Sequence, residues 1–138
     1  ARRARIINRE QNEADGFVHL EASHDGYDRI TGKPVHCREW LFEEDTLVIR
    51  DKVSGRGVHE IKSMLPLHPN IKMSSIIGNR VMLEVLGHEV LVTIEGADVL
   101  EATKSFYHPE FGMSVENTKL IFSTTERLPI VMTTRISW

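Results

Sequence analysis

The chain has 138 residues, a formal net charge of −3 with neutral histidines, 41% hydrophobic residues and 27% charged residues. This length and composition suit one folded domain with its own core and exclude a wholly disordered chain. The slightly acidic balance argues against nucleic acid as a partner, because that affinity depends on many Lys and Arg contacts to phosphates. No apolar run approaches the roughly 18 residues of a membrane-spanning helix, so no span is expected.

The N-terminus is rich in arginine, and the chain holds a single cysteine. Arg2, Arg3 and Arg5 lie at the start of a sequence without an initiator methionine. We interpret this end as the solvated start of a strand, in a piece of a longer polypeptide. Cys37 is the only thiol, which excludes an intrachain disulfide and zinc sites with two or more cysteines. We interpret Cys37 as a buried thiol, and the compartment stays open.

Period-2 alternation of apolar and polar residues predicts strands along the chain. Because successive strand side chains point to opposite faces, each such segment has one face suited to burial. The predicted strands include residues 17–22, 35–42, 46–53, 59–67, 81–85, 90–94, 118–123 and 130–136. Turn signals rich in Gly, Asn and Asp separate them at intervals of about 8–12 residues.

Two local patterns refine this prediction. The strands 81–85 and 90–94 flank Leu86-Gly87-His88-Glu89, which predicts a hairpin. Residues 98–106 carry only a weak helical pattern. About ten or eleven short strands with almost no helix predict an all-β fold, and we expect an antiparallel two-sheet β-sandwich in one domain over residues 1–138. A single sheet of that size would leave one apolar face in water.

Several separated motifs occur in the order found in one enzyme family. They are Arg2-Arg3-Ala4-Arg5, Ser23-His24-Asp25-Gly26-Tyr27, Val35-His36-Cys37-Arg38, Ile49-Arg50-Asp51-Lys52-Val53 followed by Gly55, Leu67-His68-Pro69 and Tyr107-His108-Pro109-Glu110-Phe111-Gly112. In these motifs the chain resembles the C-terminal part of heparinase II/III-like polysaccharide lyases. The resemblance is close over the first half of the chain and looser afterwards.

The resemblance implies a bacterial multidomain lyase that acts on an acidic, uronate-containing polysaccharide by β-elimination. It implies an upstream α-helical toroid domain as the partner of this sandwich, and a periplasmic or cell-envelope location. The family's catalytic tyrosine, catalytic histidine and metal-site residues lie in regions with no counterpart here. We therefore assign no catalytic residue, no metal ligand and no cofactor to this chain, although the parent enzyme could hold a metal ion.

The segment from Ala22 to Arg38 concentrates proton-transfer and anion-binding side chains around two turns. In and beside this segment we predict six substrate-binding candidates: His24, Tyr27, Arg29, His36, Arg38 and Trp40. A loop at the end of a strand is a frequent place for binding residues. His24 could instead be a turn histidine bonded to local backbone, and Tyr27 a buried aromatic with a satisfied hydroxyl.

His36 and Arg38 lie two residues apart in a predicted strand, so they share one face. The guanidinium fork of Arg38 suits a carboxylate or a sulfate. The alternative, which we slightly favour, is an ion pair with Asp51 or a nearby Glu on a neighbouring strand. Trp40 and Phe42 continue the same face; we expect Phe42 in the core, whereas Trp40 fits either a sugar-stacking surface or the core.

Three function classes remain at this stage. The leading one is the lyase domain, which completes the sandwich and offers one wall of the substrate cleft but is inactive alone. The second is a stand-alone carbohydrate- or protein-binding sandwich without catalysis. The third, a metal-dependent cupin-like enzyme, is disfavoured because the seven histidines show no closely spaced ligand motif.

Overall fold

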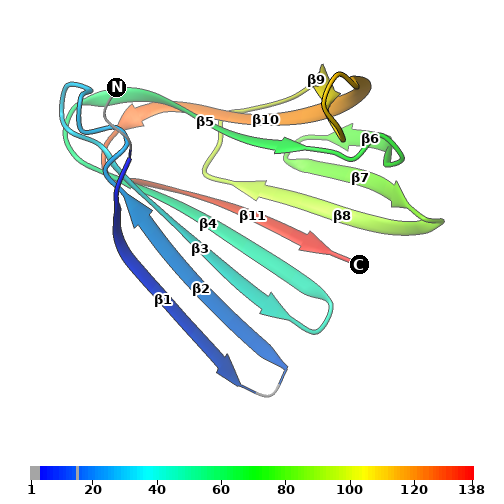
Figure 1. The fold of residues 1–138 in the computed structure, drawn as a ribbon, viewed down its shortest axis with the longest axis horizontal. Coiled ribbons are helices and arrows are strands. Elements are labelled where there is room, and N and C mark those ends of the chain that lie inside the picture. The colour runs from blue at the N-terminus through cyan, green and yellow to red at the C-terminus, as the bar shows by residue number, and fades with distance from the viewer. Residues whose placement is uncertain (1–3, 15) are drawn as a thin grey trace.

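The computed structural model describes residues 4–14 and 16–138, and in these residues it contains eleven β-strands and no α-helix (Figure 1). The strands are β1 (Ile6–Ala14), β2 (Phe17–His24), β3 (Val35–Glu43), β4 (Thr46–Ser54), β5 (Val58–Pro66), β6 (Lys72–Ile77), β7 (Arg80–Val85), β8 (His88–Glu95), β9 (Val99–Tyr107), β10 (Val115–Arg127) and β11 (Ile130–Ser137). No helix among the described residues is long and apolar enough to cross a membrane. Arg2, Arg3 and the predicted turn residue Asp15 lie outside the described residues.

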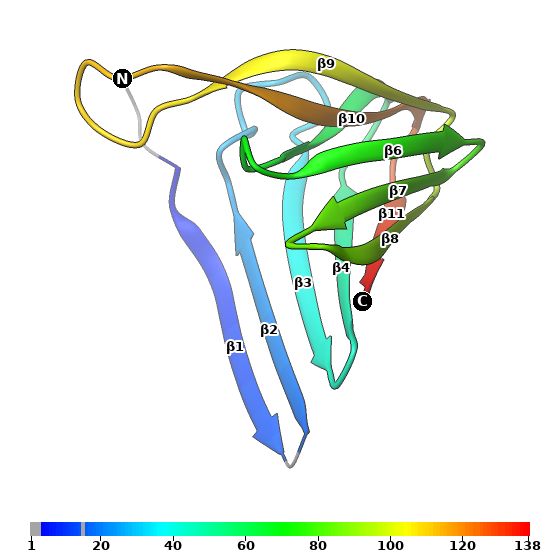
Figure 2. The same cartoon turned by 90° about the vertical axis from the view of Figure 1, so that its right-hand side faces the viewer.

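The strands form two antiparallel sheets, which confirms the predicted two-sheet sandwich. The large sheet has the order β1-β2-β3-β4-β11-β8-β7-β6, and the small sheet has the order β5-β10-β9. Figure 2 shows the small sheet lying across one end of the large sheet, above β6, β7 and β8. The chain therefore changes sheet between β4 and β5, between β5 and β6, between β8 and β9, and between β10 and β11.

The core lies where the small sheet covers the large one. Phe122 and Leu120 of β10 are 1% and 0% exposed, and they belong to one cluster with Val81 of β7 and Val92 of β8, both 0% exposed. Alternation along these strands sends the apolar side chains inward, because each strand is covered on one face only. We call the face of the large sheet that carries Val81 and Val92 the inner face.

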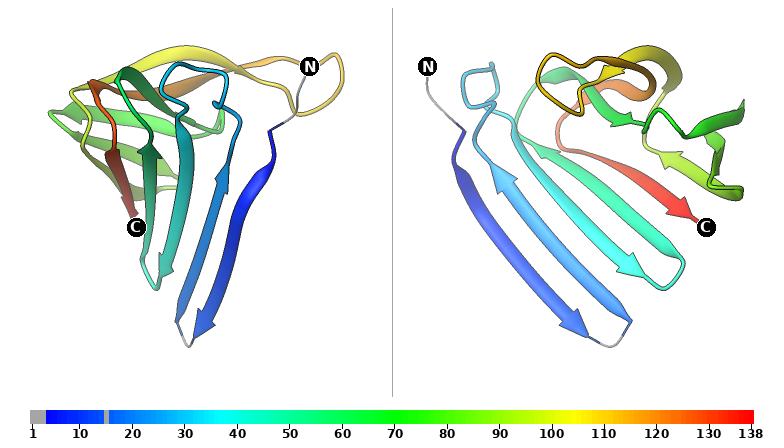
Figure 3. Two further views of the ribbon diagram at one scale, coloured as in Figure 1. Left: turned by 90° about the vertical axis from the view of Figure 1, so that its left-hand side faces the viewer. Right: turned by 45° about the vertical axis from the view of Figure 1, so that its right-hand side comes forward.

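The strands at the N-terminal edge of the large sheet extend beyond the small sheet. Figures 1 and 3 show the far ends of β1, β2 and β3 standing away from β5, β9 and β10. Phe42 at the far end of β3 is 47% exposed, and its ring contacts Trp138 at a centroid distance of 5.9 Å. The expectation of a core position for Phe42 is therefore wrong, because no layer of the described chain opposes this end of the sheet.

Two local sequence patterns, the weak helical pattern and the predicted hairpin, can be compared with the strands that form. The weak helical pattern at residues 98–106 gives no helix, because β9 finds nine cross-strand partners along β10. The predicted hairpin is present as β7 and β8, with a turn of only Leu86 and Gly87. Their φ values of 53° and 85° are the left-handed pair that a two-residue type I′ turn requires.

One corner of the sandwich joins two connecting segments. Residues 25–34 link β2 to β3, and residues 55–57 link β4 in the large sheet to β5 in the small sheet. The Arg56 backbone N–H donates to the Gly32 carbonyl at 3.1 Å. A Cβ on Gly32 would lie 1.9 Å from the Arg56 carbonyl oxygen, so the close approach of the two segments requires glycine there. This corner carries the candidate site.

Candidate functional site

A buried carboxylate, Asp51 of β4, is the centre of the site. Its side chain is 5% exposed on the inner face. Arg38 of β3 donates from Nε to Oδ1 at 2.7 Å and from Nη2 to Oδ2 at 2.9 Å. His36 Nε2 lies 2.7 Å from Oδ1, and Ser63 of β5 donates to Oδ2 at 3.0 Å. With His24, described below, these four residues form what we call the histidine–aspartate cluster.

The cluster keeps Asp51 ionised. Burial by itself raises the pKa of this carboxyl, but hydrogen bonds from His36, Arg38 and Ser63, together with the positive charge of Arg38, outweigh burial. They lower the pKa of Asp51 from 3.8 to about 2. The carboxylate is thus a fixed negative charge that links three strands from both sheets, and the cluster fastens the small sheet to the large one at this corner.

The hydrogen bonds show which ring nitrogen donates and which accepts in His24 and in His36. The Gly26 backbone N–H donates to His24 Nδ1 at 3.1 Å, and a backbone N–H can only donate. A neutral His24 therefore carries its proton on Nε2 and donates to His36 Nδ1 across 3.3 Å. A neutral His36 then carries its proton on Nε2 and donates to Asp51. With both rings neutral, every ring nitrogen thus has a hydrogen-bond partner in one continuous chain of hydrogen bonds from Gly26 to Asp51.

This chain of bonds positions the start of the loop between β2 and β3. Both ring nitrogens of His36 are engaged, so the ring orients its neighbours and is not set up as a free base. His24 in turn contacts the Tyr27 ring at a centroid distance of 5.4 Å. Tyr27 is 45% exposed and lines a small pocket of about 170 Å³ together with Ile30 and His36. The loop thus presents an aromatic ring on a rigid base.

Four of the six predicted binding residues meet in this region, namely His24, Tyr27, His36 and Arg38. Arg38 makes the ion pair with Asp51 that the sequence favoured as the alternative. Arg29 is exposed on the same loop. Trp40 lies half-buried on the inner face in register with Leu20 and Ile49, two strand positions from Arg38.

A larger cavity of about 650 Å³ adjoins the small pocket at His59, which lines both. Lys33 from the β2–β3 loop and Arg56 from the β4–β5 turn line this cavity, which we call the basic cavity. Sequence reasoning missed all three residues, because they come from segments that only the fold brings together. The available signal was the pair of glycine turns at Gly32-Lys33-Pro34 and Gly55-Arg56-Gly57, each carrying one cation.

Comparison with known proteins decides the family. A family model described as heparinase II/III-like, C-terminal, matches residues 1–138. The chain belongs to this family. The match covers both halves of the chain, including the later strands where the motif resemblance was looser, and it confirms the family prediction.

Solved structures share the fold of this heparinase II/III-like domain. Heparan sulfate lyase HepC from Pedobacter heparinus matches with a TM-score of 0.77 and 14% identity, over 97% of this chain and 22% of that one. A heparinase III with methylated lysines matches with a TM-score of 0.76 and 13% identity, over 97% and 21%. The chain therefore spans about a fifth of the length of these structures. No curated protein matches the sequence.

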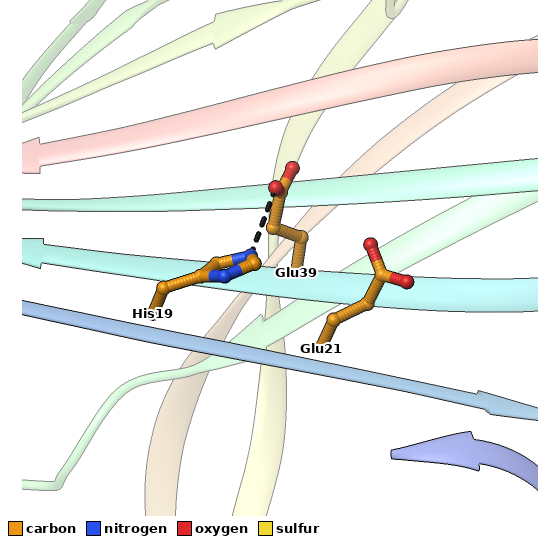
Figure 4. Close-up of side chains that lie close together, drawn as sticks. All are labelled: His19, Glu21 and Glu39. Atoms are coloured by element: carbon orange, nitrogen blue, oxygen red, sulfur yellow. Dashed lines mark hydrogen bonds and ion pairs between the residues drawn. The ribbon is translucent and has the colours of Figure 1, made fainter. Parts of the chain in front are cut away.

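The face of the large sheet opposite the inner face, which we call the outer face, carries a second cluster of polar side chains in this heparinase II/III-like domain (Figure 4). His19 Nε2 lies 3.0 Å from Glu39 Oε1, and one ligand atom each from His19, Glu21 and Glu39 lies within 4.8 Å of the others. This donor set would suit a divalent cation. Lys52 Nζ, however, lies 3.5 Å from Glu21 and 3.4 Å from Glu39, and Arg50 Nη1 lies 3.2 Å from Glu39. The chain's own cations thus compensate both carboxylates.

The electrostatics of this outer-face group also affect Cys37. Burial raises the pKa of Glu39, but Arg50 and Lys52 outweigh burial and lower it overall. Burial raises the pKa of the Cys37 thiol, and the neighbouring Glu21 carboxylate raises it further. Cys37 is half-buried instead of buried. The sequence signal for this group was His19-Leu20-Glu21, two polar residues that a strand places on one face.

Proposed function

We propose that this domain is the C-terminal β-sandwich of a lyase that cleaves an acidic, uronate-containing polysaccharide by β-elimination. The observation that carries the proposal is the family match over the whole described chain. The fold shared with a heparan sulfate lyase and with heparinase III supports it. An α-helical toroid upstream in the same polypeptide is the partner in this proposal and supplies the principal reacting groups.

In the reaction, a base removes the proton on the carbon beside the uronate carboxylate. The electron pair left behind forms a double bond to the neighbouring carbon, and the bond from that carbon to the linking oxygen breaks. An acid protonates the departing sugar oxygen, so a C–H bond and a C–O bond break while a C=C double bond and an O–H bond form. General acid–base groups must lie within hydrogen-bond reach of the atoms that change.

The domain's role in this proposal is to complete the sandwich and to form one wall of the cleft. His36 has both nitrogens engaged and Arg38 is bound to Asp51, so the histidine–aspartate cluster serves as a scaffold. The scaffold holds the loop with Tyr27 and Arg29 at the sandwich corner, where these side chains are exposed. An exposed tyrosine suits stacking against a sugar ring, and an exposed arginine suits a carboxylate or sulfate.

The test uses the intact protein with a panel of uronate-containing polysaccharides, sulfated and unsulfated, and a neutral glucan as the control. Ultraviolet absorbance of the conjugated double bond reports β-elimination. We expect absorbance to rise with at least one acidic polymer and to stay constant with the glucan. Tight binding of acidic polymers without any rise would overturn the proposal in favour of a binding module.

A further inference from the structure

We propose that the basic cavity binds an anionic substituent, a carboxylate or a sulfate, of an acidic oligosaccharide. This inference rests on the proposed function and assigns residues that neither the family match nor the sequence motifs single out. The site is formed by Lys33, Arg56 and His59 at the corner where the chain passes from the large sheet to the small one.

Charge is the first argument. Among the described residues that line the cavity, Lys33 and Arg56 give a formal charge of +2 with His59 neutral, and none is Asp or Glu. The whole chain carries −3. A concave surface lined by one sign of charge concentrates its potential and attracts ligands of the opposite sign. The cavity therefore selects for an anion on an otherwise acidic domain.

Rigidity is the second argument. The Arg56 N–H donates to the Gly32 carbonyl at 3.1 Å, and the Leu128 N–H donates to the Gly57 carbonyl at 2.9 Å. His59 Nε2 lies 2.9 Å from the Arg56 carbonyl oxygen, which can only accept, so the ring donates to it. The two segments that carry the cations are therefore fixed to one another before any ligand arrives. A preorganised site loses less conformational entropy on binding.

The backbone of Lys33 is the third argument. Its φ is 50°, and among the described residues other than glycine only Leu86 shares a positive φ. Leu86 lies in a hairpin turn that requires this conformation, whereas Lys33 precedes Pro34 in a longer loop. The left-handed conformation strains a lysine backbone, and glycine would avoid this strain. The strained position lies in the cavity wall, which Lys33 lines.

The neighbouring small pocket suggests how a sugar would lie. It shares His59 with the basic cavity and is lined by Tyr27 and Ile30. A pyranose ring has a polar edge and apolar C–H faces, so it can stack on an aromatic ring while its acidic substituent projects sideways. A sugar ring placed against Tyr27 would thus direct its carboxylate or sulfate toward Lys33 and Arg56.

The experiment measures affinity of the intact protein by calorimetry for three probes. They are a heparan sulfate oligosaccharide, an unsulfated oligogalacturonate and neutral maltohexaose. Lys33→Gln and Arg56→Gln are expected to weaken binding of at least one acidic probe about fivefold each, and the double variant further, with a smaller salt dependence. Lys104→Gln is the matched control, because Lys104 is exposed on β9 and pairs with Glu116 at 3.1 Å. Loss confined to the sulfated probe identifies a sulfate site, and loss with both acidic probes a carboxylate site.

A second variant separates binding from folding. Lys33→Gly removes the charge and relieves the positive φ, so we expect weaker binding with an unchanged or higher melting temperature. Unchanged affinity in the double variant for both acidic probes would overturn the site, even if the protein cleaves a polysaccharide. Weakened anion binding in a protein that forms no unsaturated product would retain the site and overturn the proposed function.

Discussion

Arg38 binds Asp51 through two hydrogen bonds, from Nε to Oδ1 at 2.7 Å and from Nη2 to Oδ2 at 2.9 Å. The two residues are direct cross-strand partners on the inner face of the large sheet. Ser63 of the small sheet adds a bond of 3.0 Å to the same carboxylate. The pair therefore does more than connect β3 to β4, because it ties both sheets together beside the candidate site.

Asp51→Asn tests the contribution of this carboxylate to stability. The pKa of Asp51 falls from 3.8 to about 2 on folding, so its stabilisation is fully present above pH 3.8 and is lost as the pH falls toward 2. The difference corresponds to about 2 kcal/mol at neutral pH. We expect the variant to lose about that free energy of unfolding in urea at pH 7, and to differ less from the native protein near pH 2.

The control for this measurement is Asp45→Asn, in an exposed turn between β3 and β4. We expect this substitution to leave the free energy of unfolding within about 0.5 kcal/mol of the native value. Equal stability of the native protein and Asp51→Asn at pH 7 would contradict the role given to the carboxylate.

Arg38→Ala should destabilise the domain by about 2 kcal/mol, because it removes a charged partner from a buried carboxylate. The side chain of Arg38 is 32% exposed, so solvent screens part of the effect. Arg38→Lys should restore only part of the loss, since an ammonium cannot reproduce the two parallel bonds. Thermal unfolding checks both variants. A full recovery in Arg38→Lys would show that charge alone matters.

The direction of the histidine chain is directly observable. Long-range ¹⁵N–¹H correlation spectra distinguish the two neutral tautomers of each ring, and we expect His24 and His36 both to carry the proton on Nε2. The bond from the Gly26 N–H to His24 Nδ1 fixes this assignment. A proton on Nδ1 of neutral His36 would break the chain and contradict it.

Cys37 should react slowly with alkylating reagents at neutral pH. Burial and the Glu21 carboxylate raise the pKa of its thiol, which lowers the fraction of reactive thiolate. Glu21→Gln should increase the alkylation rate of the folded protein by removing one cause of the raised pKa. Mass spectrometry over time measures the rate, and the denatured protein gives the reference. A rate unchanged by Glu21→Gln would show that burial alone controls the thiol.

The outer-face carboxylates offer a test with metal chelators. Because Lys52 and Arg50 already compensate Glu21 and Glu39, we expect a chelator to leave the melting temperature of the native protein unchanged. Lys52→Met should expose the donor set of His19, Glu21 and Glu39, so added zinc should raise the melting temperature of that variant only. A lower melting temperature of the native protein after chelation would mean that a metal occupies this group.

The sequence was sufficient to predict the fold class, because alternation and turn residues are local signals. These local signals predicted the β7–β8 hairpin and the arrangement of the strands in two antiparallel sheets. The exposure of Phe42 was not predictable, because Trp40 on the same strand face is half-buried whereas Phe42 is 47% exposed. The far end of β3 extends beyond the small sheet (Figure 1). Burial depends on which layer lies opposite, and that is a property of the whole topology.

The same limit applies to the site. His36 and Arg38 were predicted to share a face because strand periodicity fixes it, and the pairing of Arg38 with Asp51 followed as an alternative. The basic cavity was missed, since Lys33 and Arg56 are more than twenty residues apart and lie on two turns that the fold joins, as the bond from the Arg56 N–H to the Gly32 carbonyl shows. Their juxtaposition depends on a sheet crossover that the pattern of strands does not reveal.

The most direct test of the central claim is the mass of the oligosaccharides released by the intact protein from an acidic polysaccharide. Cleavage by β-elimination adds no water, so the account predicts products that are one water molecule lighter than those of hydrolysis and carry a double bond at the new non-reducing end. Hydrated products, or an intact polymer with every uronate-containing substrate, would contradict it.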